Sequence, residues 1–345
     1  MKTSNNPKVL MLSIGYGGFG GTELGAERLH NWLEDNGVDV VVIASGRSKD
    51  IMRVPTFGVW RVFWPLFAYI ISVAYACFRD FDVIYARYAT YPLFVGVVLK
   101  YISGKPLVVS IHGGDIRHGV PLSWLINAFL RRADKVVCYD NIGHINELKR
   151  RGIDPLMIPN GVDTRLFKLR KAKSNKNKII YAGGTRDIKG WFDIISVVND
   201  EVLCRRKDIE FHIYGDGSIG SDDVIFFHSK VAHSDMPSIL ETGQLFILPS
   251  KAEGVPTALL EAMASGMFVI ASDLDYTRTV FDKKFLFKPG DVGRMRELIV
   301  RFCDDRVGYF KGQDVNNRKI VLNKYSMDVV WQKWKELFIC LAKRG

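Results

Sequence analysis

Short apolar runs recur along the chain, and each segment between them is long enough for one helix. The runs are rich in Val, Ile and Phe and apolar at most positions, which is typical of parallel strands covered by helices on both faces. We therefore predict ten strands, at 8–14, 38–44, 82–86, 106–111, 135–139, 178–183, 209–215, 223–228, 245–250 and 267–272.

A polar connector divides these runs into two sets. Residues 165–178 (RLFKLRKAKSNKNK) carry seven Lys or Arg and no acidic residue. Two sets of strands on either side of such a connector predict an α/β protein with two Rossmann-like parallel-sheet domains facing a cleft. We place the first domain at 1–166 and the second at 167–326.

Charge and cysteine content exclude several classes of protein. The formal net charge is +11, but the connector alone carries seven of these charges, so no broad basic face for nucleic acid is predicted. The five cysteines are scattered and form no CxxC pair, which argues against a disulfide framework and a zinc site. The N-terminus leads straight into a strand without the apolar core of a signal peptide, so we expect a cytoplasmic protein.

Glycine-bearing turns follow several of the predicted strands. Ligands of open parallel sheets bind beyond the carboxyl ends of the strands, and glycine there lets backbone N–H groups approach a phosphate. Five such turns indicate one extended anionic ligand lying between the domains. They are GYGGFGGTE (15–23), HGGD (112–115), GTRDIKG (184–190), GDGS (215–218) and KAEG (251–254).

The first of these turns also fits a different class of enzyme. Residues Gly15–Gly20 match GxGxxG, so a NAD-type oxidoreductase using this loop is an alternative. A dinucleotide site also needs an acidic residue at the end of the second strand to hold the ribose. That strand ends in Ala44-Ser45-Gly46-Arg47, and the nearest acid, Asp39, lies at its beginning.

Two DxD-like pairs are candidates for metal ligands. Asp80 and Asp82 lie just before a strand, at the wrong edge of the sheet, and are interpreted as a solvated turn. Asp273 and Asp275 follow a strand and are better placed, but nothing nearby completes a metal shell. We therefore expect no metal site.

With these turns in place, the chain resembles a family-4 retaining glycosyltransferase of the GT-B fold over nearly its whole length. The most specific element is the E-x7-E signature, formed by Glu253 and Glu261 within EGVPTALLEAMASG. The segment YSMDVVWQKWKELF (325–338) resembles the family's C-terminal helix, which crosses back to the first domain, so we assign 327–345 to that helix. Supporting elements are GGTE (20–23), HGGD (112–115), IPNGVD (158–163), Lys189-Gly190 and YGDG (214–217).

The resemblance implies a function. It implies a retaining, metal-independent glycosyltransferase of the hexosyltransferase class that needs no cofactor. The enzyme would move a sugar from a nucleotide-sugar, bound by the second domain, to a hydroxyl of a glycan or lipid-linked acceptor on the side of the first. Such transfer serves polysaccharide, glycolipid or glycoprotein assembly. A non-catalytic nucleotide-sugar-binding partner, an epimerase and a phosphorylase of the same fold remain alternatives.

The two glutamates receive roles from the resemblance. Glu253 contacts the donor sugar, and Glu261 accepts hydrogen bonds from the nucleotide ribose, whose vicinal diol suits the two oxygens of a carboxylate. Pro256 suits the first position of the intervening helix. The alternative is that both acids merely favour a helix N-terminus. That explains Glu253 but not Glu261, since the dipole effect fades after the first turn.

The resemblance also assigns the other site residues. Lys189 contacts the donor diphosphate, and Arg186 takes the role of an arginine that relatives carry where this chain has Gly184. His112 contacts the donor sugar or the acceptor. The backbone of Gly20 and Gly21 approaches the diphosphate or acceptor, and Glu23 and Asp115 lie on the acceptor side. The remaining donor-binding positions are Gly184, Gly215, Gly254, Val255 and Thr257.

One apolar stretch is relevant to whether the protein associates with a membrane. The run VFWPLFAYIISVAYACF (62–78) has no charge, but it is shorter than the roughly 20 residues of a membrane span and contains Pro65. It also lies between two strands predicted for one sheet, which a single crossing would separate. We expect it to pack inside the first domain or at a membrane interface. Together with the basic 165–178 connector, it predicts peripheral association with the anionic inner face of the membrane.

Overall fold

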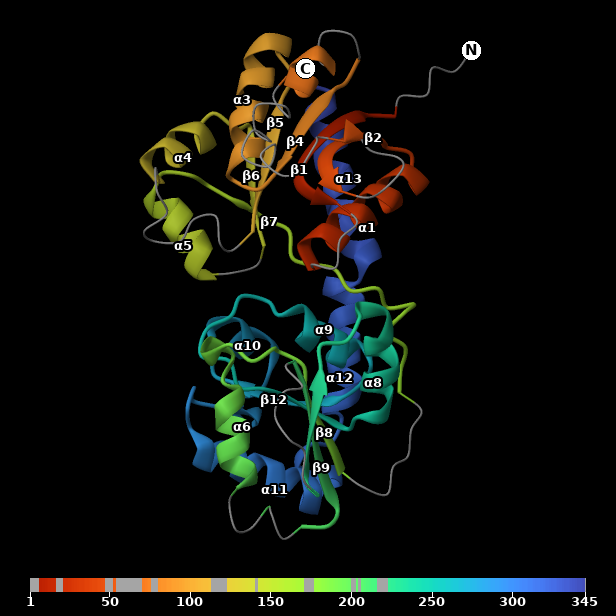
Figure 1. Ribbon diagram of the computed structural model, residues 1–345, viewed down its shortest axis with the longest axis vertical. Coiled ribbons are helices and arrows are strands. Elements are labelled where there is room, and N and C mark those ends of the chain that lie inside the picture. Colours follow the sequence, from red (N-terminus) through yellow and green to blue (C-terminus); the bar gives the residue numbers. More distant parts are fainter. Residues whose placement is uncertain are drawn as a thin grey trace. The chain divides into compact units, whose positions relative to one another are not determined.

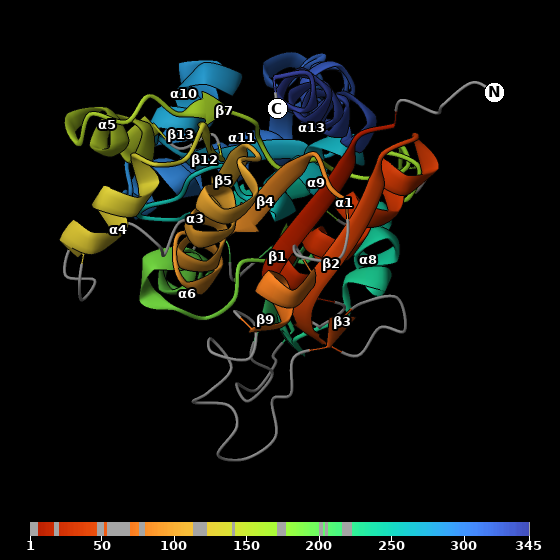
Figure 2. The same cartoon turned by 90° about the horizontal axis from the view of Figure 1, so that it is seen from above.

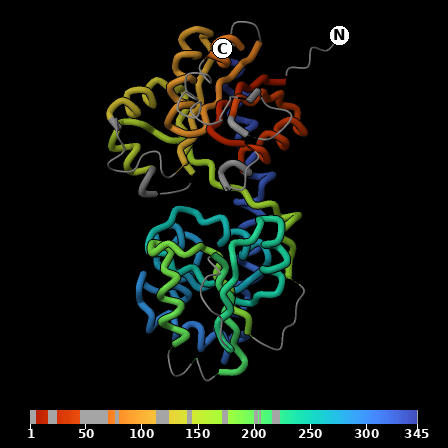
Figure 3. Tube along the Cα trace, viewed as in Figure 1, coloured from red at the N-terminus to blue at the C-terminus, as the bar shows by residue number. Residues whose placement is uncertain are grey.

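The computed structural model describes most of the chain, drawn in colour in Figure 3. The described residues are 6–16, 21–46, 52–53, 70–75, 80–112, 123–139, 142–170, 177–199, 203, 206–215 and 223–344. The chain forms two compact units: the first is Met1–Pro159 together with Val330–Gly345, and the second is Asn160–Val329.

The described strands of the first unit form a seven-stranded parallel sheet in the order β3-β2-β1-β4-β5-β6-β7. β1 pairs with β2 on one side and β4 on the other (Figure 2). The strands are β1 (Lys8–Tyr16), β2 (Asp39–Gly46), β3 (Met52–Arg53), β4 (Val83–Arg87), β5 (Leu107–Ile111), β6 (Lys135–Cys138) and β7 (Leu156–Met157). The helices are α1 (Gly21–Asp35), α3 (Tyr91–Ser103), α4 (Ser123–Leu130), α5 (Ile142–Arg150) and α13 (Met327–Ala342).

Helices cover both faces of this sheet, as the apolar strands require. Leu93, Ile126 and Leu148 of α3, α4 and α5 pack on one face in a single apolar core. On the other side lie α1 and α13 (Figure 1). There the ring centroid of Tyr85 from β4 lies 4.8 Å from that of Trp334 in α13. From Val330 onward, α13 therefore belongs to the first unit.

The second unit contains a parallel sheet whose described strands number six, in the order β10-β9-β8-β11-β12-β13. Its strands are β8 (Asn177–Tyr181), β9 (Ile209–Gly215), β10 (Ile225–Ser229), β11 (Leu245–Leu248), β12 (Phe268–Ser272) and β13 (Leu286–Phe287). Its helices are η1 (Asp187–Lys189), α6 (Trp191–Val198), η2 (His233–Asp235), α8 (Met236–Thr242), α9 (Thr257–Ala264), α10 (Asp275–Val280), η3 (Lys283–Phe285), α11 (Val292–Tyr309), α12 (Gln313–Ile320) and the π-helical η4 (Val321–Tyr325).

The second sheet is also covered on both faces. On one face, α6 and α11 bury Ile194 and Phe302 against the strands. On the other, α8 and α9 bury Leu240 and Leu259 (Figure 1). Because Ile179 faces the first core and Ile180 the second, successive residues of β8 are both buried. This two-sided burial accounts for the continuous apolar pattern of the strand.

The fold class predicted from the sequence is confirmed. Each of the ten predicted strands has a counterpart among the described residues, and β3, β7 and β13, with two residues each, are additional. The unit boundaries at 159/160 and 329/330 lie a few residues from the predicted 166/167 and 326/327. The first difference arises because Val162, predicted to belong to the first domain, is buried in a core of the second unit and bridges to Ser326.

The apolar run 62–78 lies largely outside the described residues. Within it, residues 70–75 are helical, with Ser72 fully buried and Ile70 half exposed. Among the helices that the structure describes, none has both the length and the apolar composition for a membrane crossing.

Candidate active site

Lys189 and Glu253 form an ion pair beyond the carboxyl ends of β8 and β11. Lys189 ends η1, and its Nζ donates to Oε1 of Glu253, which lies in the turn between β11 and α9. Ser250 Oγ donates to the same carboxylate oxygen at 3.1 Å. The two side chains are only 17% and 15% exposed. The fold thus joins two predicted site residues that are 64 positions apart.

A glycine holds the η1 turn close to this carboxylate. Gly190 has a left-handed φ of 69°, and a Cβ on it would lie 2.0 Å from the carbonyl oxygen of Pro249. The backbone N–H of Lys251 donates to the carbonyl of Ile188 at 2.8 Å. Only glycine fits this approach, because both its φ and the lack of a Cβ are required. The backbone therefore positions Lys189 beside Glu253.

The preceding glycine turn is held by a tyrosine. The hydroxyl of Tyr181 donates to the carbonyl of Gly184 at 2.5 Å. Burial raises the pKa of Tyr181, the charge of Glu253 raises it further and Arg186 opposes this, so the phenol stays protonated and donates. Gly215 packs against this turn, since a Cβ on it would lie 3.1 Å from Cα of Gly184. The predicted positions Gly184 and Gly215 are thus in contact.

Glu261 is a buried acid with a histidine partner. Its side chain in α9 is 9% exposed, and its Oε1 lies 2.7 Å from Nε2 of His233 in η2. The ring of Phe167 meets that of His233 edge-on, with centroids 5.5 Å apart. His233 could not be predicted as a site residue from the sequence, because a lone histidine after β10 belongs to no motif. Its hydrogen bond with Glu261 offsets part of the free-energy cost of burying that carboxylate.

The helix that carries Glu261 begins one residue later than predicted. Pro256 has an extended ψ of 126° and is the N-cap, so α9 starts at Thr257. Pro256 therefore precedes the first helical position instead of occupying it, and that prediction was wrong by one residue. Gly254 and Val255 lie in the turn between Glu253 and the helix. Thr257 is exposed at the helix start.

In the first unit, His112 follows β5 and lies between two tyrosine rings. Its ring centroid is 4.4 Å from that of Tyr88 and 4.6 Å from that of Tyr139. Burial, with a smaller contribution from the charge of Arg87, holds the pKa of His112 well below its usual value, so the imidazole is neutral. These residues gather at the carboxyl ends of β4, β5 and β6.

Some predicted residues cannot be placed at the site. Gly20 and Asp115 lie outside the described residues. Gly21 begins α1 and Glu23 lies in its first turn, where the structure describes the backbone only. Arg186 is exposed as the N-cap of η1, next to the predicted Lys189.

Sequence comparison identifies the family. The family described as Glycosyltransferase Family 4 matches residues 19–166, and the family described as Glycosyl transferases group 1 matches residues 176–305. The chain belongs to the family-4 glycosyltransferases. Its GT-B fold is that of the structural neighbours below, and the alternative of a NAD-type oxidoreductase is set aside.

Two relatives each match more than two thirds of the sequence of this family-4 glycosyltransferase. The UDP-Gal:alpha-D-GlcNAc-diphosphoundecaprenol alpha-1,3-galactosyltransferase of Escherichia coli is 24% identical over 286 residues, covering 71% of this chain and 72% of that protein. An uncharacterized glycosyltransferase of Methanocaldococcus jannaschii is 24% identical over 287 residues, with coverages of 77% and 78%.

Solved structures share the fold of this glycosyltransferase. Sucrose-phosphate synthase from Thermosynechococcus elongatus superposes with a TM-score of 0.79 at 16% identity, covering 99% of this chain and 100% of that one. The apo form of a lipopolysaccharide outer core galactosyltransferase gives a TM-score of 0.69 at 16% identity, with coverages of 97% and 99%.

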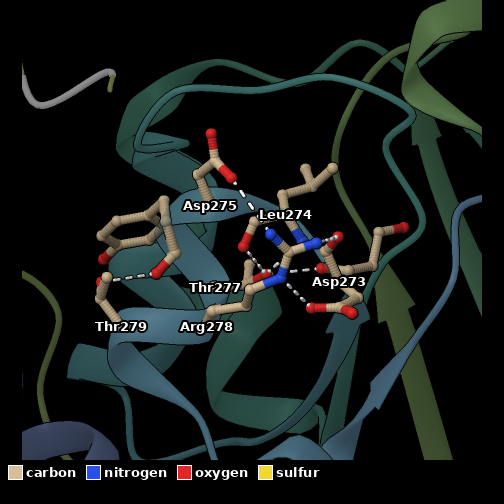
Figure 4. A network of polar contacts seen from close by, with 8 residues as sticks. Asp273, Leu274, Asp275, Thr277, Arg278 and Thr279 are labelled. Carbon is tan, nitrogen blue, oxygen red and sulfur yellow. Dashed lines mark hydrogen bonds and ion pairs between the residues drawn. The ribbon is translucent and has the colours of Figure 1, made fainter. Parts of the chain in front are cut away.

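The second DxD-like pair of this glycosyltransferase is held by an arginine. Figure 4 shows Arg278 of α10 reaching both carboxylates, with Nε 2.7 Å from Asp273 Oδ1 and one terminal nitrogen 3.2 Å from Asp275 Oδ1. The first pair differs, since Asp80 is exposed beside Lys8 and Asp82 accepts from the Lys8 backbone at 2.9 Å. Within the described ranges, no group of three or more His, Cys, Asp or Glu could hold a metal ion.

Proposed function

We propose that this glycosyltransferase moves a sugar from a nucleotide-sugar to a hydroxyl of a glycan or lipid-linked acceptor, with retention of configuration and without a metal or cofactor. The observation that carries the proposal is the arrangement of Lys189, Glu253 and Glu261 in the second unit. An ammonium, a carboxylate beside it and a second carboxylate on the following helix match the three parts of such a donor. These parts are a diphosphate, a sugar and a ribose.

The ion pair gives Lys189 and Glu253 complementary tasks. A diphosphate beside Lys189 would replace Glu253 as its partner, and its charge would be stabilised further by the N-terminus of α6. The carboxylate of Glu253 would then accept hydrogen bonds from sugar hydroxyls. As the bond between the anomeric carbon and the phosphate oxygen breaks, negative charge grows on that oxygen, and Lys189 stabilises it.

Retention follows from attack on the face that the leaving group departs from. The phosphate oxygen that leaves the anomeric carbon takes the proton of the acceptor hydroxyl, whose oxygen forms the new bond. We assign no carboxylate as a covalent nucleophile, because Glu253 is assigned to the sugar hydroxyls and Glu261, which is paired with His233, to the ribose. Attack by the acceptor on the same face forms the new bond directly, without a covalent sugar–enzyme intermediate.

Incubation with a panel of nucleotide-sugars, with and without glycan and lipid-linked acceptors, tests the proposal. We expect one nucleotide-sugar to release its nucleoside diphosphate, faster with an acceptor, and to give a product whose anomeric configuration matches the donor by NMR. An inverted product would overturn retention. Binding of a nucleotide-sugar with no turnover on any acceptor would instead favour the non-catalytic binding partner.

Metal independence gives a first prediction. Because Arg278 already pairs with both Asp273 and Asp275, we expect EDTA to leave the transfer rate at half or more of its value, roughly a loss below 0.5 kcal/mol in activation free energy. The measurement is the initial rate with EDTA and after added magnesium or manganese. A rate that is abolished by EDTA and restored by the metal would make these aspartates ligands.

A second prediction concerns His233. Replacing it by Leu removes the hydrogen bond that orients Glu261, so we expect the nucleoside diphosphate that binds best to lose about tenfold or more in affinity. Calorimetric titration measures this loss. His233→Gln is the matched control, since its amide can reach the same carboxylate, and it should bind more tightly than His233→Leu. Equal affinities for His233→Leu and the unmodified chain would contradict a role for this contact.

A lipid-linked acceptor is supported by the Escherichia coli relative, whose name specifies a diphosphoundecaprenol acceptor. The first unit also exposes apolar side chains beside basic ones. Trp124 is 68% exposed, and Tyr101 is 63% exposed with the Arg132 guanidinium donating to its hydroxyl at 2.8 Å. Aromatic side chains next to cations favour a lipid interface.

The third prediction is therefore reversible binding to anionic vesicles. We expect the protein to sediment with phosphatidylglycerol vesicles at low salt and to be released at high salt, since the attraction is screened. Trp124→Ser should weaken sedimentation, and Val307→Ser, which alters an exposed apolar side chain of the second unit, should not. Protein that stays in the supernatant at low salt would point to a soluble acceptor.

A further inference from the structure

Two histidine rings meet at the edge of the second sheet. β10 is the outermost described strand next to β9, and the register sets Phe226 beside His212 and His228 beside Tyr214. Because alternate residues of a strand share a face, these four rings lie on one face of the sheet. Nδ1 of His212 lies 3.0 Å from Nε2 of His228, and the two ring planes differ by 6°. A hydrogen bond therefore joins the two imidazoles across the strands.

A carboxylate sets the direction of this hydrogen bond. Oε2 of Glu210 on β9 lies 3.4 Å from Nε2 of His212, the ring nitrogen that does not face His228. Since a carboxylate only accepts, His212 donates from Nε2 and is left with Nδ1 as an acceptor. His228 then donates to that Nδ1 from its own Nε2. Lys178 on β8 also contacts the carboxylate, with Nζ 3.7 Å from the same Oε2.

The surroundings of the pair disfavour positive charge on it. Burial lowers the pKa of both imidazoles, and the charge of Lys178 lowers both pKa values further. At His212 the hydrogen bond with Glu210 acts in the opposite direction. Both rings are therefore neutral at pH 7. Among the described residues, Lys178, Glu210 and the phenol of Tyr214 are the titratable groups beside the pair on β8 and β9.

The pair can take up one proton without losing its hydrogen bond, but not two. A first proton fits on Nδ1 of His228, which takes no part in the bond, and makes the bond charge-assisted. A second proton must go on Nδ1 of His212, which is the accepting nitrogen. Two N–H groups and two positive charges would then face each other, so the bond breaks and the rings separate.

Tyr214 connects the pair to the glycine turns at the end of the sheet. Its ring lies nearly parallel to that of His228, with 4.4 Å between the centroids, and packs against the core that α8 and α9 cover. The next residue, Gly215, is in close contact with Gly184. A movement of Tyr214 therefore reaches the turn at 183–190, which carries Lys189.

We propose that His212 and His228 form a pH-sensitive switch in the second unit. While the pair holds at most one extra proton, the hydrogen bond joins β10 to β9 and keeps Tyr214 in place. When both rings are charged, the bond breaks, β10 loosens at the edge of the sheet, and the turn at 183–190 loosens with it. The switch is separate from the sugar transfer proposed above and operates without a ligand.

Unfolding of the full chain in denaturant between pH 7 and pH 5 tests the switch. Both histidines have a lower pKa in the folded chain than in the unfolded one, so their contribution to stability is present above about pH 6.5 and is lost as the pH falls. We expect the unfolding equilibrium constant to rise about tenfold more in the unmodified chain than in the double variant His212→Gln, His228→Gln. An equal rise in both chains would overturn the proposal.

Hydrogen exchange followed by mass spectrometry locates the change and needs no variant. After correction for the pH dependence of intrinsic exchange, we expect the amides of β10 and of residues 183–190 to lose about tenfold in protection between pH 7 and pH 5. β12, on the far side of the same sheet, is the internal control and should keep its protection. Unchanged protection of β10 would overturn the switch. A loss in β10 without one in residues 183–190 would overturn the connection through Tyr214.

Discussion

Replacing Lys189 by Ala is expected to lower turnover about 10²- to 10³-fold, the loss seen when one preorganised charge-stabilising group is removed. Lys189 is the cation that ends η1, and its ammonium is paired with Glu253 in a site that is mostly shielded from water. Since its charge acts on the departing diphosphate, the effect should fall mainly on kcat. Steady-state kinetics with the preferred donor provide the measurement.

Two neighbouring cations serve as comparisons for Lys189. Lys251→Ala removes an exposed positive charge close by and leaves the backbone bond to Ile188, so turnover should change less than about twofold, as for an exposed and screened charge. Arg186→Ala should cost about as much as Lys189→Ala if Arg186 replaces the arginine that relatives carry at the position of Gly184. Near-normal activity of Arg186→Ala would refute that replacement. A loss in Lys251→Ala equal to that in Lys189→Ala would refute the specific role of Lys189.

Gly190→Ala should destabilise the second unit by about 2 to 5 kcal/mol and remove most of the transfer activity. The left-handed φ contributes about 1–2 kcal/mol, and the contact of the new Cβ with the Pro249 carbonyl adds a steric term that backbone cannot relieve cheaply. The measurement is the free energy of unfolding from denaturant titration, combined with the transfer rate. Activity falls because the turn that carries Lys189 must move away from Glu253.

Gly290→Ala separates the cost of a left-handed φ from the cost of the steric contact with Pro249. Gly290 has a φ of 82°, but a Cβ there would meet nothing within 4 Å. Its replacement should therefore cost only the backbone term of about 1–2 kcal/mol and leave transfer unchanged. If Gly190→Ala were no more destabilising than Gly290→Ala, the close approach to Pro249 would not be a constraint on the turn.

Most of the fold could be predicted from the sequence, because a strand that is buried on both faces is a continuous run of apolar residues. β8 is buried on both sides by Ile179 and Ile180, so its run is apolar without alternation. β3, β7 and β13 have two residues each, which is too short for such a run, so these strands were not predicted. The start of α9 was predicted one residue early, because proline is compatible with both the N-cap and the first helical position.

By itself, the sequence determined the two sheets, the glycine turns at the strand ends and the pair of glutamates at a spacing that marks the family. The tertiary structure decided which side chains meet: Lys189 with Glu253, Glu261 with His233, and Arg278 with Asp273 and Asp275. The contacts of Lys189 with Glu253 and of Glu261 with His233 join residues that follow different strands, so the order of the strands in the sheet determines them. A local pattern encodes which faces are buried, but it does not encode which strand lies beside which.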